Sequence, residues 1–252
     1  MHIEAELIKA KIGAFRGRDE RNNRLVLEAL ALNGPLIKYD IFKTLKPKGV
    51  RHYPTLSRRV DDLKERGYIA VAGRRPIKVG KRSEESPTYG LTWRGFITSL
   101  AIESVTEDIT EVLENEPLLK FDLPHRIPKE MVVNVLRELF TPTEIGIIAR
   151  AVLVGFLRAL PRDIESVKQE NYLAYLVPGL TEVPEIRERF EKKDLTKLLQ
   201  IPGLLELVSS LVETYEGQLS QALSGIRVIK GELARYKSTR AHGTRQLTNK
   251  KS

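Results

Sequence analysis

The 252-residue sequence contains no cysteine and only four histidines, and each shortage excludes a kind of site. Without cysteine the chain has no disulfides and no thiolate-bound zinc, which fits a reducing, cytoplasmic setting. The histidines are too scattered to show the spacing of metal ligands, since they are His2, His52, His125 and His242. We therefore predict no metal and no cofactor.

Long apolar runs are also missing. The longest, residues 145–160, has 16 residues and includes Arg150 and Arg158, whereas a membrane-spanning helix needs ~20 predominantly apolar residues. Residues 1–7 lack the apolar core of a signal peptide. We interpret residues 145–160 as a buried core helix and expect no membrane partner.

No arrangement typical of an enzyme is present, because no nucleophile is accompanied by a base and an orienting group. Two pairs of adjacent carboxylates could suggest a nuclease metal site, namely Asp61–Asp62 and Glu84–Glu85. We favour solvated ion pairs on a helix face, with Asp62 bound to Arg58 and Asp61 to Arg58 or Lys64. The prediction is a protein that is not an enzyme.

Charge is distributed unevenly along the chain. Residues 1–100 hold 21 Lys and Arg against 11 Asp and Glu, residues 101–223 hold 13 against 21, and residues 224–252 hold 8 against 1. The net charges of +10, −8 and +7 add to the +9 of the whole chain. Two basic regions around an acidic middle indicate a polyanionic partner.

The basic first part has the order of elements of a winged helix-turn-helix. Short apolar helices are expected at about residues 22–33 and 36–45, and a third at 54–67, with Pro54 in its first turn and Gly67 closing it. Two strand-like runs, 68–71 and 89–92, are separated by a basic loop and could pair as a hairpin. The fold class is therefore mainly α: three helices and a β-hairpin wing, followed by an all-helical part.

The third helix, residues 54–67, has the surface of a DNA-recognition helix. Leu56, Val60 and Leu63 share one face and must be buried, so Arg58 points away from the core. Arg and Thr are side chains that reach base edges in a major groove, and a basic hairpin suits phosphates. The predicted DNA-binding residues are Arg51, His52, Tyr53, Thr55, Ser57, Arg58, Arg59, Arg74, Arg75, Lys78, Lys81 and Arg82.

The stretches LSRRVDDLKERGYI (56–69) and YGLTWRG (89–95) resemble the recognition helix, wing and exit segment of archaeal winged-helix transcription regulators of the MarR/PadR kind. The resemblance covers residues 22–100, under half of the chain. It implies a DNA-binding regulator that is usually a dimer. The helical remainder resembles no family, although an apolar cleft within it is where a small-molecule effector would bind, and a protein effector is the alternative.

The predicted domains are an N-terminal helix and linker (1–21), the winged helix (22–100), an all-helical domain (101–236) and a basic disordered tail (237–252). Residues 3–15 are expected to form a helix packed on the winged helix or, alternatively, an arm that contributes to a dimer contact or touches DNA through Arg16 and Arg18. A helix is expected from Trp93 to about Asn115, and others near residues 162–177 and 184–199. Thr141, Pro142 and Glu144 predict a capped helix start.

Residues 202–236 carry a heptad pattern, with apolar side chains separated by alternating steps of three and four residues. Its members are Leu205, Val208, Val212, Tyr215, Leu219, Ala222, Ile226, Ile229, Leu233 and Tyr236. Gly217, Gly225 and Gly231 weaken a rigid helix by about 1 kcal/mol each. We favour an intermolecular dimerisation helix over one packed within its own protomer.

The sequence is compatible with three functions. The first is a homodimeric, sequence-specific regulator that binds double-stranded DNA, with residues 54–67 in the major groove and the wing, residues 73–87, on backbone or minor groove. The second is a non-specific architectural or replication-associated DNA-binding protein that depends on its basic tail. The third is a winged helix that docks another protein and binds no duplex.

Overall fold

The computed structural model describes residues 2–79, 82–119 and 129–168, together with 172, 175 and 193. In chain order its elements are α1 (His2–Lys11), η1 (Gly13–Phe15), α2 (Glu20–Asn33), α3 (Lys38–Leu45), α4 (Tyr53–Glu65), β1 (Ile69–Val79), β2 (Arg82–Leu91), α5 (Trp93–Ser99), α6 (Glu103–Glu107), α7 (Ile109–Asn115), α8 (Lys129–Leu139), α9 (Pro142–Ala159) and η2 (Ile164–Ser166).

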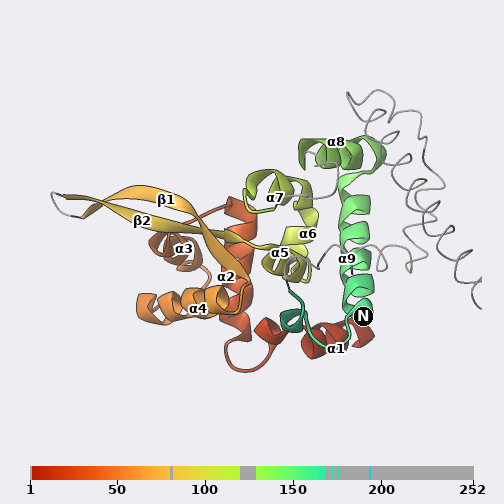
Figure 1. Ribbon diagram of the computed structural model, residues 1–252, viewed down its shortest axis with the longest axis horizontal. Helices are drawn as coiled ribbons and strands as arrows, with labels where there is room; N and C mark the ends of the chain where they lie inside the picture. The colour runs from red at the N-terminus through yellow and green to blue at the C-terminus, as the bar shows by residue number, and fades with distance from the viewer. Residues whose placement is uncertain are drawn as a thin grey trace, which may run out of the picture. The chain divides into compact units, whose positions relative to one another are not determined.

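Helices α2, α3 and α4 and the β1–β2 hairpin form the predicted winged helix (Figure 1). Their apolar faces meet in one core, to which α2 contributes Leu27 and Leu30, α3 contributes Ile41, and α4 contributes Leu56 and Val60, all at most 1% exposed. The turn before α3 adds a short third strand position, because Leu36 and Tyr89 exchange two backbone hydrogen bonds of 3.1 and 2.8 Å. The fold class predicted from the sequence is confirmed.

The C-terminal end of α4 closes as its sequence predicts. Gly67 has φ +72°, which a glycine adopts without steric cost. Its N–H bonds to the carbonyl of Lys64, and the next N–H, of Tyr68, bonds to that of Leu63, each at 2.9 Å. These two bonds make a Schellman motif. The chain therefore leaves α4 directly into β1 at Ile69.

The hairpin is longer than the sequence suggested. Strands were expected at 68–71 and 89–92, but antiparallel pairing continues from Ile69 opposite Leu91 out to Val79 opposite Arg82, with one bulge between Val71 and Gly73. The expected basic loop is thus mostly strand. Charged residues, glycines and prolines are typical of loops, so the sequence favours a loop here. In a two-stranded ribbon, however, both strands are edge strands, where these residues are tolerated.

The single helix expected over residues 93–115 is wrong, because the chain forms α5, α6 and α7 instead. Hydroxyl side chains bond to backbone carbonyls three residues earlier: Ser99 to Phe96 and Thr106 to Glu103, at 2.7 and 2.8 Å. Such bonds compete with a continuous helical ladder. The two breaks let α6 pack on α9 and α7 pack on α8.

Helix α9 is a buried core helix, as the sequence predicted. Leu153, Phe156 and Leu157 are at most 2% exposed. At its start Thr141 and Glu144 form the predicted capping box. No single helix among the described residues is both long and apolar enough to cross a membrane, and α8 with α9 reaches those limits only when the two are counted together across a 118° bend.

Two further expectations are corrected. Helix α1 packs on α9 rather than on the winged helix, and η1 provides the contact with α2. The helix expected near residues 162–177 is absent over 162–168, where only the short η2 forms. The heptad segment 202–236, the helix expected at 184–199 and the basic tail lie outside the described residues.

Candidate nucleic-acid interface

Helix α4 presents one basic side chain straight away from the core. With Leu56, Val60 and Leu63 buried, a rotation of about 100° per residue places Arg58 on the opposite side. Arg58 is exposed and forms no hydrogen bond or ion pair within the described part of the chain. Its guanidinium therefore keeps its donors and its charge available to a partner molecule.

One flank of α4 faces α3. Lys38 of α3 lies 2.6 Å from the Asp61 carboxylate and 3.1 Å from the Ser57 hydroxyl. The prediction that Asp61 pairs with Arg58 or Lys64 is wrong, because Lys38 brings a partly buried ammonium from the neighbouring helix. Ser57, a predicted DNA contact, is already an acceptor in this cluster.

The other flank of α4 faces the turn before α2. Arg59 binds Asp19 at 2.7 Å and Asp62 at 2.9 Å. The predicted pair of Asp62 with Arg58 is therefore wrong, since Asp62 turns to a guanidinium that Asp19 also holds in place. Arg59 is exposed by only 20%, which leaves Thr55 and Arg58 as the more accessible side chains of the predicted set here.

The N-terminal end of α4 combines charge with exposed aromatic rings. Arg51 and His52 are exposed ahead of the helix. Tyr53 packs edge-on against Phe42 and Tyr39, with ring centroids 5.6 and 6.5 Å apart. Tyr39 is 57% exposed and Tyr53 38%. The sequence did not single out Tyr39, because a lone tyrosine in a short helix carries no signal until α3 and α4 are brought together.

The wing places its basic residues on two faces. Side chains alternate along a strand, so Arg74 and Lys78 share one face of β1 and Arg75 lies on the other. Arg75 reaches back to the carboxylate of Asp40 in α3. Arg74 is 67% exposed and only 3.9 Å from Glu85, a weak surface pair. Of the remaining predicted wing residues, Lys81 lies outside the described residues and only the backbone of Arg82 is described.

The turn before α2 adds a residue to this surface. Arg18 lines a hollow together with Asp19, Thr55, Arg58 and Arg59. It is exposed and unpaired within the described ranges. Arg16, two residues earlier, is instead turned onto α1, where it donates to the backbone carbonyls of Lys9 and Ala10. Arg16 and Arg18, which the sequence analysis named together as possible DNA contacts, therefore lie in different environments.

The chain was compared with protein families, curated proteins and solved structures. No protein-family model matches the sequence, and no curated protein matches it at a significant level. One solved structure that matches is Bacillus subtilis PadR in complex with operator DNA. It is 14% identical, covers 67% of this chain and 96% of that chain, and has a TM-score of 0.22. At that TM-score the match carries no information about what this chain binds.

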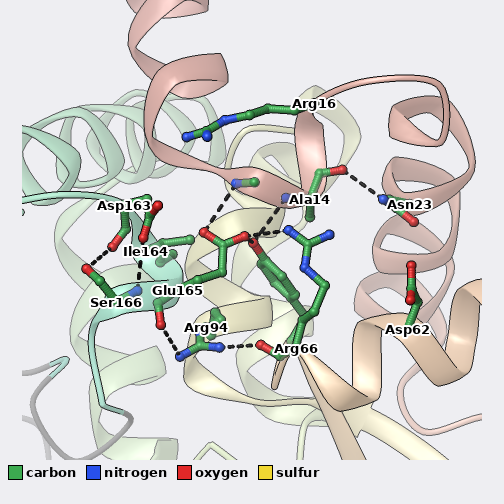
Figure 2. Close-up of polar contacts among 12 residues, drawn as sticks. Ala14, Arg16, Asn23, Asp62, Arg66, Arg94, Asp163, Ile164, Glu165 and Ser166 are labelled. Atoms are coloured by element: carbon green, nitrogen blue, oxygen red, sulfur yellow. Dashed lines mark hydrogen bonds and ion pairs between the residues drawn. The ribbon is translucent and has the colours of Figure 1, made fainter.

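A second polar cluster, which the sequence did not reveal, joins η2 to the winged helix (Figure 2). The Glu165 carboxylate accepts hydrogen bonds from the Gly13 N–H at 3.3 Å, from Arg66 at 2.7 Å and from the Tyr68 hydroxyl. The Ala14 N–H donates to the same hydroxyl at 3.1 Å. Burial, followed by the Glu165 contact, raises the pKa of Tyr68, so this phenol stays neutral.

Arg94 extends the same cluster from α5. It donates to the hydroxyl of Tyr172 at 2.7 Å and to the carbonyl of Val167 at 2.9 Å, and it also bonds the carbonyl of Arg66. Tyr172 in turn donates to the carbonyl of Ile164 at 2.9 Å. Segments far apart in the chain are thereby fixed to the end of α4 and the start of the wing.

One hollow of about 430 Å³ lies between α6 and α9. Its lining combines charged side chains with apolar surface from Pro142 and Ile147, and Arg150 pairs with Glu103 at 3.2 Å. Among the described residues no group of His, Cys, Asp or Glu side chains could hold a metal ion.

Proposed function

We propose that this protein is a sequence-specific, DNA-binding transcription regulator that acts as a homodimer. Helix α4 enters the major groove, and Thr55 and Arg58 face base edges. Arg74 and Lys78 of the wing follow the DNA backbone or the minor groove. The observation that carries the proposal is Arg58, which is exposed on the outward face of α4 and forms no hydrogen bond or ion pair with the residues that the structure describes.

Charge supports a duplex as the partner. A guanidinium that already binds carboxylates gains little from a phosphate or a base, and Arg59 and Arg75 are in that position. Arg58, Arg51 and Lys78 are not, since they are exposed and unpaired in the described part of the protein. Their side chains can replace the counterions of a duplex without first breaking an ion pair.

The choice of Arg58 for base recognition rests on its chemistry. Its planar guanidinium can donate two hydrogen bonds to O6 and N7 of one guanine, which distinguishes that base pair in the major groove. The aromatic rings of Tyr39 and Tyr53, at the N-terminal end of α4, lie where the helix would approach the sugar-phosphate backbone, to which tyrosine hydroxyls commonly bond.

Dimerisation through residues 202–236, by way of Leu205, Val208, Val212 and the other heptad positions, stays a prediction. In that arrangement two α4 helices would sit about one helical turn of DNA apart, roughly 34–36 Å, and the preferred site would be pseudo-palindromic. A small-molecule or protein effector is likewise a prediction.

The test is a selection of bound duplexes from a random-sequence library with the purified full-length protein. We expect enrichment of a two-part site with half-sites about one turn apart. Equal affinity for selected and random duplexes would instead indicate a non-specific architectural protein. Absence of binding to any duplex at moderate salt would favour a protein-docking module.

The substitution Arg58→Lys tests the proposed role of Arg58 in base recognition. Lysine keeps the charge but loses the two-pronged geometry of the guanidinium. We expect discrimination at one base position to fall by about 1–3 kcal/mol while the salt dependence of binding stays that of the wild type. Lys78→Ala is the matched comparison, because it should weaken all sequences alike and flatten the salt dependence.

A further inference from the structure

The two flanks of α4 are not equivalent. On one flank Ser57 and Asp61 face α3 through Lys38, and the wing reaches the same helix through the contact of Arg75 with Asp40. On the other flank, Arg59 is held by Asp19 of the turn before α2. In Figure 1 the hairpin lies on one side of α4 and this turn on the other.

A helix in a major groove has a phosphate backbone on each side, because the groove is bordered by both strands. The wing can serve only one of these borders. The other border must meet whatever lies on the flank of α4 that bears Thr55 and Arg59. In this protein that neighbour is the turn of residues 17–19 and the first turn of α2.

The charges of this turn are suited to phosphate. Its carboxylates are already neutralised, Asp19 by Arg59 and Glu20 by Arg24. Arg18 is exposed and unpaired among the described residues. Arg21 is also exposed and donates to the backbone carbonyl of Lys48 at 3.2 Å, a contact that leaves its positive charge uncompensated.

The backbone of the turn leaves room for a second chain to approach. Gly17 has φ +75°, which lets the chain reverse direction between η1 and α2. Apart from the two adjacent residues, no atom of the described part of the chain lies within 4 Å of the position that a Cβ would take there. The turn is thus held in place through Asp19 while its outer surface, with Arg18, remains open.

We propose that residues 17–21 form a second phosphate-binding element, which contacts the DNA backbone on the side of α4 opposite the wing through Arg18 and Arg21. This inference rests on the proposed function, because it assumes that α4 occupies a major groove. The wing and the turn would then contact the phosphate backbones on the two sides of the same major groove.

The experiment measures affinity against salt concentration with a duplex of about 30 base pairs, roughly three helical turns, taken from the random-sequence selection. The slope of log K against log salt concentration is negative, and each lost phosphate contact reduces its magnitude by about 0.9. We expect a fall of about one for Arg18→Ala and about two for Arg18→Ala with Arg21→Ala. Arg16→Ala is the matched control, since it removes the same charge from a side chain turned onto α1, and its slope should equal that of the wild type.

A hydroxyl-radical footprint shows which border is lost. The double variant should lose protection on one side of the groove and keep the protection made by the wing. A double variant with the wild-type slope and footprint overturns the inference and leaves the proposed function standing. A wild-type protein that binds no duplex overturns both.

Discussion

The hydroxyl of Tyr68 donates a hydrogen bond to the carboxylate of Glu165, 97 residues further along the chain. Tyr68 is fully buried between the end of α4 and the start of β1, and Glu165 lies in η2. Because Arg66 and Gly13 bind the same carboxylate, three distant segments meet at this one group. The junction between the recognition helix and the wing is therefore fixed by residues outside the winged helix.

Tyr68→Phe should destabilise the fold by about 1–3 kcal/mol, because it leaves the buried Ala14 N–H without its acceptor and Glu165 without one donor. Equilibrium denaturation of full-length protein measures the loss. Tyr53→Phe is the control, since that ring is 38% exposed and its stability should change by less than about 0.5 kcal/mol. Equal stabilities for the two variants would contradict a structural role for the buried hydroxyl.

Arg58 and Arg59 should separate binding from stability. Arg59→Ala removes the partner of Asp19 and Asp62 together with a largely buried stem, and should cost about 1 kcal/mol of folding stability, a modest value because both carboxylates are 44% exposed. Arg58→Ala should leave stability unchanged and weaken DNA binding by about 1–3 kcal/mol. Thermal denaturation and binding measurements on both variants check this. The reverse pattern would mean that the roles of these neighbours are exchanged.

Gly95→Ala should be strongly destabilising, although alanine usually stabilises a helix relative to glycine. Gly95 lies in the first turn of α5, and a Cβ there would come 2.0 Å from the carbonyl oxygen of Tyr68. Relieving that overlap means moving α5 away from the wing, at a cost of about 1–3 kcal/mol or more. Gly73→Ala, with its nearest atom at 3.4 Å, is the control in denaturation experiments. A Gly95→Ala protein as stable as the wild type would contradict the close approach.

The winged helix could be predicted from the sequence because its signals are local. Leu56, Val60 and Leu63 share a helical face, and Gly67 ends the same helix. The partners of Arg59 and Asp61 could not be predicted, because they come from Asp19 and Lys38, which only the packing of three helices brings near. The Glu165 cluster was missed for the same reason.

Spacing alone also misled the prediction for residues 93–115. Val105, Ile109 and Val112 are buried, as their spacing predicts, but Val105 lies in α6 and the other two lie in α7. Helical periodicity indicates which residues share an apolar face. It does not indicate where a helix is interrupted by hydroxyl side chains that bond to the backbone. For the wing the error was opposite, since charged and glycine-rich sequence concealed paired strands.

Glu116 gives the fold a dependence on pH. Its side chain is fully buried beside the base of the wing, where one oxygen accepts the Leu91 N–H at 2.8 Å and the other has no partner among the described residues. Burial raises the pKa of Glu116 to about 8, against the opposing effects of the Leu91 N–H and of Lys129. The carboxyl is therefore protonated in the folded protein at neutral pH.

A carboxyl whose pKa is higher in the folded than in the unfolded chain stabilises the fold most at low pH. The free energy of unfolding should fall as pH rises from about 4.5, where Glu116 ionises in the unfolded chain, to about 8. It should change little above that pH. At about 1.4 kcal/mol per pKa unit, the loss is roughly 3–5 kcal/mol. Glu116→Gln keeps the acceptor for Leu91 and cannot ionise, so its melting temperature should vary less over this range. Parallel melting curves for the two proteins across these pH values would show that Glu116 is ionised in the fold.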